Sequence, residues 1–445
     1  MIRDLTLLSD KPEELEGEIQ RSPDWISPEL FKDFDVARGN RIFGSIGDVV
    51  VFTLKTRGSY SEMETLWGAK VPLDINKHYI GVLCERGSTK LMTAEFPRLP
   101  FPITDGLELQ FVAQAGGIGY VTGFSPQLKK EAGIGVACDV ELEGIVWSEK
   151  GAVNISETAI APPKIFKAEE IPPNILILGT ATDVGKTTIA KELIGGLSKK
   201  FACGAVKASG TGWYEDSLLH LNAGALPVLN YTFAGLPTTY YVDEKKYVKS
   251  MKAIYWLMAH PEKMKREYLP PEERDRNLRR LDVIVTEHGG DLVWANIPSF
   301  LKNKELMRSV FCIVVCCESA VGLLGALNEL KRVGVRNSRI MIYASVPLTN
   351  PEAFFKRVQT LIGAGITGVV DVNKPQNTGD ARKAYSIHYK AILSPDELVE
   401  ILGKDLNRLE GKKRIGGFKL ARGGHYGWKK TNRLFGTSGD EQESS

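Results

Sequence analysis

The sequence lacks the features that mark metal-rich, secreted, membrane-spanning and nucleic-acid-binding proteins. Its six cysteines show no metal-ligand spacing, and Cys312, Cys316 and Cys317 lie in or beside an apolar run, where cysteine acts as a small hydrophobic residue. No apolar run approaches the roughly 20 residues that span a bilayer. The formal net charge of +3 is small for 445 residues and argues against a nucleic-acid partner. Because no basic region followed by an apolar core opens the chain, we expect no signal peptide and a reducing, cytoplasmic location.

The composition is that of a folded protein with more than one domain. Apolar residues make up 43% and charged residues 25% of the chain, as in ordinary globular proteins, and the length exceeds that of one average domain. Residues 161–174 contain four prolines and therefore predict a stiff linker. We accordingly expect one domain at 1–160, a second at 175–410, and a basic, partly disordered tail at 411–445.

The first domain is predicted to be rich in β-strands. Residues 1–40 of this domain contain two predicted helix starts, at Lys11 and Ser27. Short strand-like runs separated by turn residues then follow at near-regular intervals. These runs cover residues 47–55, 79–84, 107–112 and 140–146. The pattern indicates a small barrel or a sandwich.

The second domain alternates buried strands with helices, which predicts an α/β fold with a doubly wound, mostly parallel sheet. The predicted strands are 175–178, 202–207, 281–287, 311–316 and 340–346, and the predicted helices are 321–333, 351–362 and one that begins at Ser394. Residues 228–280 are interpreted as a helical insertion. Ligands of such sheets bind at the carboxyl ends of the strands, so we expect the functional residues there.

The most informative stretch joins the first of these strands to the helix after it. It reads Gly179-Thr-Ala-Thr-Asp-Val-Gly-Lys-Thr187, and strand, glycine loop and helix together predict a phosphate-binding loop. The loop N–H groups and the helix dipole favour an anion. Lys186 is predicted to reach the β- and γ-phosphates and Thr187 to hold Mg²⁺. The predicted nucleotide-binding residues are Gly179, Thr180, Thr182, Asp183, Val184, Gly185, Lys186, Thr187 and Thr188. The loop is one residue longer than the ordinary motif, which needs a glycine at position 180.

These nine residues resemble the phosphate loop of dethiobiotin synthetase, Gly-Thr-x-Thr-x-Val-Gly-Lys-Thr. That family belongs to the P-loop group of the cobyrinic acid amidases and of the MinD and nitrogenase iron-protein ATPases, and the resemblance extends more loosely over 174–375. It implies an enzyme that uses ATP and Mg²⁺ to phosphorylate a carboxylate or carbamate to a mixed anhydride, in cofactor or small-molecule biosynthesis. We therefore expect a small acid or amine as substrate, and a homodimer.

Further candidate residues stand at the ends of predicted strands. Lys207 can neutralise a transferred phosphoryl group, and it aligns with the family's lysine for the substrate carbamate. Glu287 aligns with the family's metal-binding glutamate, and Asp216, which follows a glycine-rich turn and begins a helix, is the candidate for a second metal ligand. His288 departs from the family pattern. It is predicted to bind substrate or act as acid or base, and a structural role for it stays open.

Two alternative functions also stay open. A MinD-like regulatory or assembly ATPase usually carries an extra lysine near the start of its loop, where this chain has Thr180 and Ala181. A GTP-dependent metallochaperone is disfavoured by the absence of His/Cys clusters. The stretch Asn373-Lys-Pro-Gln376 is similar to the guanine-reading Asn-Lys-x-Asp, but Gln376 replaces the carboxylate, which favours adenine.

Overall fold

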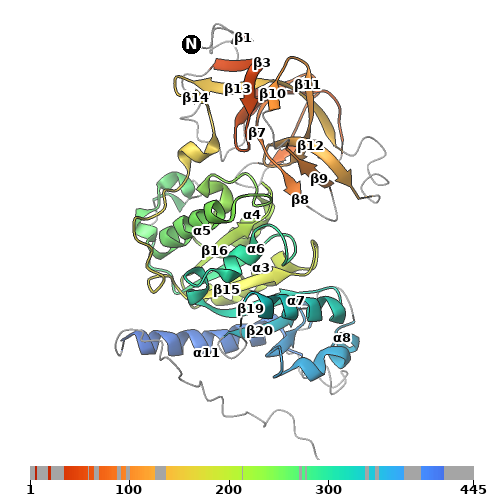
Figure 1. The fold of residues 1–445 in the computed structure, drawn as a ribbon. Helices are drawn as coiled ribbons and strands as arrows, with labels where there is room; N and C mark the ends of the chain where they lie inside the picture. Colours follow the sequence, from red (N-terminus) through yellow and green to blue (C-terminus); the bar gives the residue numbers. More distant parts are fainter. Residues whose placement is uncertain are drawn as a thin grey trace, which may run out of the picture.

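The chain folds into an N-terminal β domain and a C-terminal α/β domain (Figure 1). The computed structural model describes residues 6–7, 19–21 and 35–414, apart from 59, 65–69, 88–91, 97–100, 126–136, 213, 270–272, 276–277, 336–339, 346–349 and 375–391. The helix starts predicted at Lys11 and Ser27, Gln376, and the tail from residue 415 lie outside the described residues. None of the described helices is both long and apolar enough for a membrane crossing.

Five strands of the β domain close into a ring because β11 pairs with both β12 and β13. The ring consists of β4 (Val49–Leu54), β7 (His78–Leu83), β11 (Leu107–Ala113), β12 (Gly117–Phe124) and β13 (Cys138–Ser148), and only the β7–β12 pair is parallel. Each of the four predicted strand runs overlaps one of these strands, and the runs 47–55 and 79–84 extend beyond the ends of β4 and β7. Closure buries a core that includes Phe52, Phe111, Val140 and Leu142, and it leaves these five strands without a free edge.

Shorter strands extend this sheet or stand beside it. They are β1 (Thr6–Leu7), β2 (Ile19–Arg21), β3 (Asp35–Gly44), β5 (Glu62–Glu64), β6 (Lys70–Pro72), β8 (Arg86–Gly87), β9 (Met92–Glu95), β10 (Phe101–Ile103) and β14 (Gly151–Ala152). Strands β5 and β6 pair only with each other among the described residues and form a separate antiparallel ribbon. A 3-10 turn at Ile155–Thr158 closes the domain, with Asn154 and Glu157 forming its capping box.

The α/β domain is built on a seven-stranded sheet in the order β17-β16-β18-β15-β19-β20-β21. The strands are β15 (Asn174–Gly179), β16 (Cys203–Ser209), β17 (Val228–Asn230), β18 (Val283–His288), β19 (Val310–Cys316), β20 (Met341–Ser345) and β21 (Gly368–Val370). Every neighbouring pair is parallel. The predicted parallel α/β sheet is therefore confirmed. Its continuous apolar strands reflect burial on both faces.

Helices cover both faces of this sheet. Helices α3 (Lys186–Leu197) and α11 (Pro395–Arg414) pack on one face, and α5 (Glu244–Ala259), α6 (Ile297–Lys302), α7 (Ala320–Arg332) and α8 (Pro351–Val358) pack on the other. The short helix α4 (Glu215–Asn222) lies beside α3. The segment 228–280, interpreted from the sequence as an insertion, supplies edge strand β17 and covering helix α5.

The β domain lies next to the α/β domain (Figure 1) and contacts the segment that follows the carboxyl end of β16. Thr211, just after β16, donates from its hydroxyl to the Glu85 carbonyl. A Cβ atom placed on Gly87 of β8 would come within 2.3 Å of the Tyr240 ring, so the backbone of β8 packs directly against that side chain. The end of the sheet where ligands bind in this architecture therefore faces the β domain.

Candidate functional site

The predicted phosphate-binding loop lies between β15 and α3, as the sequence indicates. Gly185 begins α3 with a φ of 83°, a left-handed conformation that suits glycine. A Cβ on Gly179 would lie 2.7 Å from Cδ of Lys186, so glycine is needed there for this lysine to fold back over the loop. Lys186 Nζ donates to the carbonyl of Ala181 at 2.5 Å. Its pKa is lowered by burial and by the nearby ammonium of Lys207.

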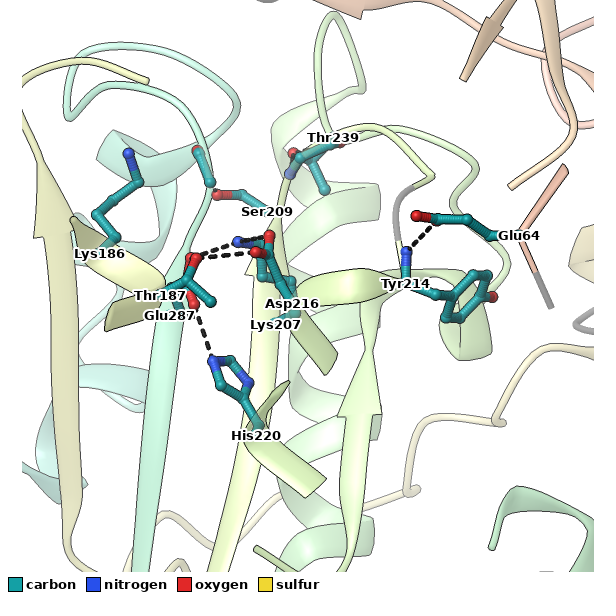
Figure 2. Close-up of polar contacts among 12 residues, drawn as sticks. Glu64, Lys186, Thr187, Lys207, Ser209, Tyr214, Asp216, His220, Thr239 and Glu287 are labelled. Carbon is teal, nitrogen blue, oxygen red and sulfur yellow. Dashed lines mark hydrogen bonds and ion pairs between the residues drawn. The ribbon is translucent and has the colours of Figure 1, made fainter. Parts of the chain in front are cut away.

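Three side chains predicted from separate parts of the sequence meet beside this loop (Figure 2). Lys207 Nζ lies 2.5 Å from Asp216 Oδ2 and 2.5 Å from Glu287 Oε1. Thr187 Oγ1 lies 2.8 Å from Asp216 Oδ1 and 2.9 Å from Glu287 Oε1, and its single proton can go to one of them at a time. The predicted metal ligands and the predicted catalytic lysine thus form one charged cluster.

Strand register explains how Lys207 and Glu287 meet. The two residues are direct partners in the parallel pair β16–β18, so their side chains leave the same face of the sheet. That face also carries Val283, Val285 and the buried side of α3. Asp216 and Thr187 reach the cluster from the first turns of α4 and α3.

The electrostatics of the cluster are those of a buried ion pair with more than one partner. Burial alone would raise the pKa of Glu287, but Lys207 and the hydrogen bond from His220 outweigh it and hold the pKa well below the usual range. Burial would lower the pKa of Lys207, and Asp216 and Glu287 reverse that effect and raise it. Both groups are therefore charged at neutral pH.

The residues present fit Mg²⁺. Thr187, Asp216 and Glu287 offer a hydroxyl and two carboxylates, the oxygen ligands that Mg²⁺ takes together with phosphate oxygens and water. The described residues contain no group of three or more His, Cys, Asp or Glu side chains that could hold a metal by themselves. The ammonium of Lys207 already lies between the two carboxylates, so this position accepts a cation.

His288 lies apart from the cluster. Neighbouring residues of a strand point to opposite faces, and its ring packs edge-on against Phe300 of α6, with centroids 4.9 Å apart. Neither ring nitrogen has a hydrogen-bond partner among the described residues, and burial lowers the pKa of His288 to about 3. The structure places it as a neutral core residue, and we assign it no part in the chemistry.

The other predicted loop residues surround Lys186 at varied depth. The backbone N–H of Thr180 donates to the Cys316 carbonyl, and Val184 is buried. Asp183 and Thr188 are more exposed, with Asp183 at a φ of 59°. Such backbone strain clusters at functional sites.

Two other polar residues near the ends of these strands, Ser209 and Asp291, make contacts outside the cluster. Ser209 donates to the Gly289 carbonyl. Asp291 accepts from the backbone N–H of Val293.

Sequence reasoning missed His220. Its Nε2 lies 2.8 Å from Glu287 Oε2 and donates, because a carboxylate only accepts. The ring is fully buried, so it fixes the orientation of this carboxylate. A signal was present, since His220 follows Asp216 by four residues in α4 and thus shares its helix face.

Sequence reasoning also missed Glu64 of strand β5. No local sequence pattern points to this residue, because its contact partner is distant in the chain. Its Oε2 accepts from the backbone N–H of Tyr214 at 2.9 Å, across 150 positions of sequence (Figure 2). The side chain is buried, and Oε1 has no hydrogen-bond partner among the described residues. Burial raises the pKa of Glu64 to about 7, an effect that the Tyr214 hydrogen bond only partly offsets.

Replacing Lys207 with methionine should destabilise the α/β domain, because two buried carboxylates lose their counter-charge. Breaking such a pair costs about 3–5 kcal/mol. We expect a lower Tm by calorimetry, and we expect Mg²⁺ to raise the Tm of the variant more than that of the wild type, since the metal replaces the ammonium. Lys167→Met, at an exposed pair with Glu170, is the control. An equal Mg²⁺ response in all three proteins would contradict the proposed cation position.

The ionisation of Glu64 should make stability depend on pH near neutrality. Its pKa is about 7 in the folded chain and 4.5 as a model value, so between these values the folded state holds one proton more than the unfolded state. Stability therefore falls as pH rises through this window. We expect the Tm of the wild type to decline more steeply than that of Glu64→Gln between about pH 5 and pH 7.5. Parallel pH profiles would show that Glu64 titrates normally.

Comparisons with known proteins give only a distant likeness. No family model matches the sequence, and no curated protein matches it. Among solved structures, a putative plasmid partition protein from Borrelia burgdorferi bound to AMPPNP is similar over 53% of this chain and 99% of its own, with 14% identity and a TM-score of 0.27. A ParA family ATPase from Chlorobium tepidum TLS covers 53% of this chain and 94% of its own, with 12% identity and a TM-score of 0.29.

A third similar structure is a nucleotide-binding protein from Archaeoglobus fulgidus in complex with ADP. It covers 53% of this chain and 92% of its own, with 11% identity and a TM-score of 0.27. Likenesses this weak carry no argument about activity, so the functional interpretation rests on the cluster itself.

Proposed function

We propose that this chain binds a nucleoside triphosphate with Mg²⁺ at the loop between β15 and α3 and transfers its γ-phosphoryl group. The observation that supports this most is the convergence of Thr187, Asp216 and Glu287 around the ammonium of Lys207, beside the loop that carries Lys186. Bound Mg²⁺ would neutralise the charge that develops on the phosphates.

The residues of the chain divide this work between them. Lys186 exchanges the Ala181 carbonyl for a phosphate oxygen, and the N–H groups at the start of α3 face the same anion. Thr187, Asp216 and Glu287 supply the oxygens for the metal. His220 donates to Oε2 of Glu287, which leaves Oε1 directed at the cluster.

We propose ATP as the nucleotide. A guanine-reading carboxylate is missing at position 376 of the sequence. The lysine of that segment, Lys374, contacts Glu397 of α11 at 2.8 Å.

We also propose a reducing cytoplasm as the compartment, since all six cysteines are buried thiols.

The finer proposal is that a small acid accepts the phosphoryl group, as the loop's resemblance to dethiobiotin synthetase suggests. An oxygen of the acceptor's carboxylate or carbamate forms a bond to the γ-phosphorus while the bond to the β,γ-bridging oxygen breaks. ADP leaves, and a nucleophile on the substrate then displaces phosphate from the mixed anhydride. Lys207 would orient the acceptor in this scheme.

One observation favours a second candidate, a MinD-like ATPase switch. The ammonium of Lys207 is engaged at 2.5 Å by two carboxylates, so an acceptor acid has to compete with both for it. A nucleotide-driven dimerisation cycle makes no such demand. The two candidates share the nucleotide site. They differ in what the nucleotide drives, which is phosphorylation of a small acid in the first and dimerisation in the second.

Lys186→Ala should abolish turnover, because it removes the positive charge closest to the transferred phosphoryl group. We expect a loss of at least about 100-fold in kcat/KM for nucleotide hydrolysis, which corresponds to about 2.7 kcal/mol of transition-state stabilisation. Phosphate release with ATP·Mg²⁺ measures this. Lys191→Ala removes an exposed lysine from the same helix and should keep normal turnover. Unchanged turnover in Lys186→Ala would remove the assignment of the loop.

A substrate screen separates the two candidates. For a ligase-like enzyme we expect particular small acids or amines to stimulate ADP formation and to raise the Tm with ATP·Mg²⁺, because ligand binding stabilises the folded state. A switch protein should respond to no small acid and should instead dimerise with ATP and dissociate with ADP in analytical ultracentrifugation. A nucleotide-independent mass combined with stimulation by an acid would exclude the switch.

A further inference from the structure

The segment that joins β16 to α4 is held by the β domain at three points. Thr211 donates to the Glu85 carbonyl, the backbone N–H of Ala115 donates to the Gly212 carbonyl, and the N–H of Tyr214 donates to Glu64 Oε2. The β5–β6 ribbon adds a fourth contact, Lys70 with Glu215 at 3.3 Å. That last pair is largely exposed and contributes little. The buried contact is Glu64 with Tyr214.

This contact supplies what the start of α4 lacks. Tyr214 is the N-cap residue and makes no side-chain capping bond, although the first N–H groups of a helix have no partner within it. The carboxyl group of Glu64 accepts a hydrogen bond from this N-cap N–H. Its own backbone N–H donates to the Gln114 carbonyl, so the β domain fixes its position.

Helix α4 carries two members of the charged cluster. Asp216 is its second residue and contacts Thr187 and Lys207, and His220 one turn later contacts Glu287. A shift of the first turn of α4 therefore moves the Asp216 carboxylate relative to Thr187. An error of about 1 Å in such placement is large for a metal or phosphate site.

We propose that Glu64 is a positioning residue through which the β domain sets the start of α4, and with it the Asp216 carboxylate, for metal binding. This inference rests on the proposed nucleotide and Mg²⁺ function. It gives the β domain a part in the site without any contact to the nucleotide, and it assigns that part to a hydrogen bond rather than to the charge of Glu64.

Three variants separate these roles. Glu64→Ala removes the acceptor for the Tyr214 N–H, whereas Glu64→Gln keeps an acceptor oxygen and removes the charge. Glu62→Gln, two residues earlier in β5, makes the same chemical change at a side chain for which the structure shows no contact with α4. Glu64→Asp keeps the carboxyl group but is too short to reach the Tyr214 N–H. This variant replaces Glu64→Ala in the experiment if Glu64→Ala does not fold.

The experiment measures metal and nucleotide affinity separately on the full chain. Mn²⁺ affinity is followed by the EPR signal of the free ion with a non-hydrolysable ATP analogue present, and affinity for a fluorescent ATP analogue is measured in EDTA. We expect Glu64→Ala to weaken Mn²⁺ binding about tenfold, the effect of losing one intramolecular hydrogen bond. Metal-free nucleotide affinity should stay unchanged. Glu64→Gln and Glu62→Gln should match the wild type, and Glu64→Asp should weaken Mn²⁺ binding.

The outcomes distinguish this inference from the proposed function. If the wild type binds nucleotide and Mn²⁺ but neither Glu64→Ala nor Glu64→Asp changes Mn²⁺ affinity, the positioning role is wrong and the proposed function stands. If Glu64→Ala loses metal-free nucleotide binding to the same extent as Mn²⁺ binding, Glu64 has a merely structural role. If the wild type binds no nucleotide, both proposals fall.

Discussion

The ammonium of Lys207, held between the carboxylates of Asp216 and Glu287, is the interaction on which the candidate site depends. Each group would be costly to bury alone, and together they stay ionised in the interior. The arrangement joins the end of β16, the end of β18 and the start of α4. A third strand enters through Thr187, which follows β15 and its loop. One buried ammonium thus holds together the two carboxylates that the proposed metal site uses.

The same constraint explains why the cluster suits a metal ion. Two carboxylates that face each other repel, and a cation between them removes the repulsion. Lys207 provides that cation from within the chain. Under the proposed function, Asp216 and Glu287 would hold Mg²⁺ and Lys207 would be free to face an anion beside them. Lys186 would likewise leave its present acceptor, the Ala181 carbonyl, for a phosphate oxygen.

The β domain contributes through its position and not through a motif. Its closed ring of strands lies beside the end of β16, and its contacts fall on the short segment between β16 and α4. A buried carboxylate with one unpartnered oxygen is an unusual feature in a protein core. Among the described residues, Glu64 has this feature at the point where the two domains meet, which is why we place a functional role there.

The parallel sheet, the glycine loop between β15 and α3, and the polar side chains at the ends of the central strands could all be predicted from the sequence. These follow from local patterns: apolar runs of strand length, a glycine loop between strand and helix, and polar residues directly after a strand. Lys207 and Glu287 could be named because the carboxyl ends of parallel strands meet at one edge. The exact partner of each residue could not be named from that rule.

Two features of the site could be seen only in the folded structure: the orientation of His288 and the contact of Glu64. It turned His288 away from the site, because one step along a strand changes the face of the sheet, and no sequence pattern shows which of two neighbouring polar residues faces the ligand. It brought Glu64 to Tyr214 across 150 positions, a contact that depends on how two separately folded domains pack. Periodicity reports which side of an element is buried, whereas the identity of the neighbour depends on packing between elements distant in the chain.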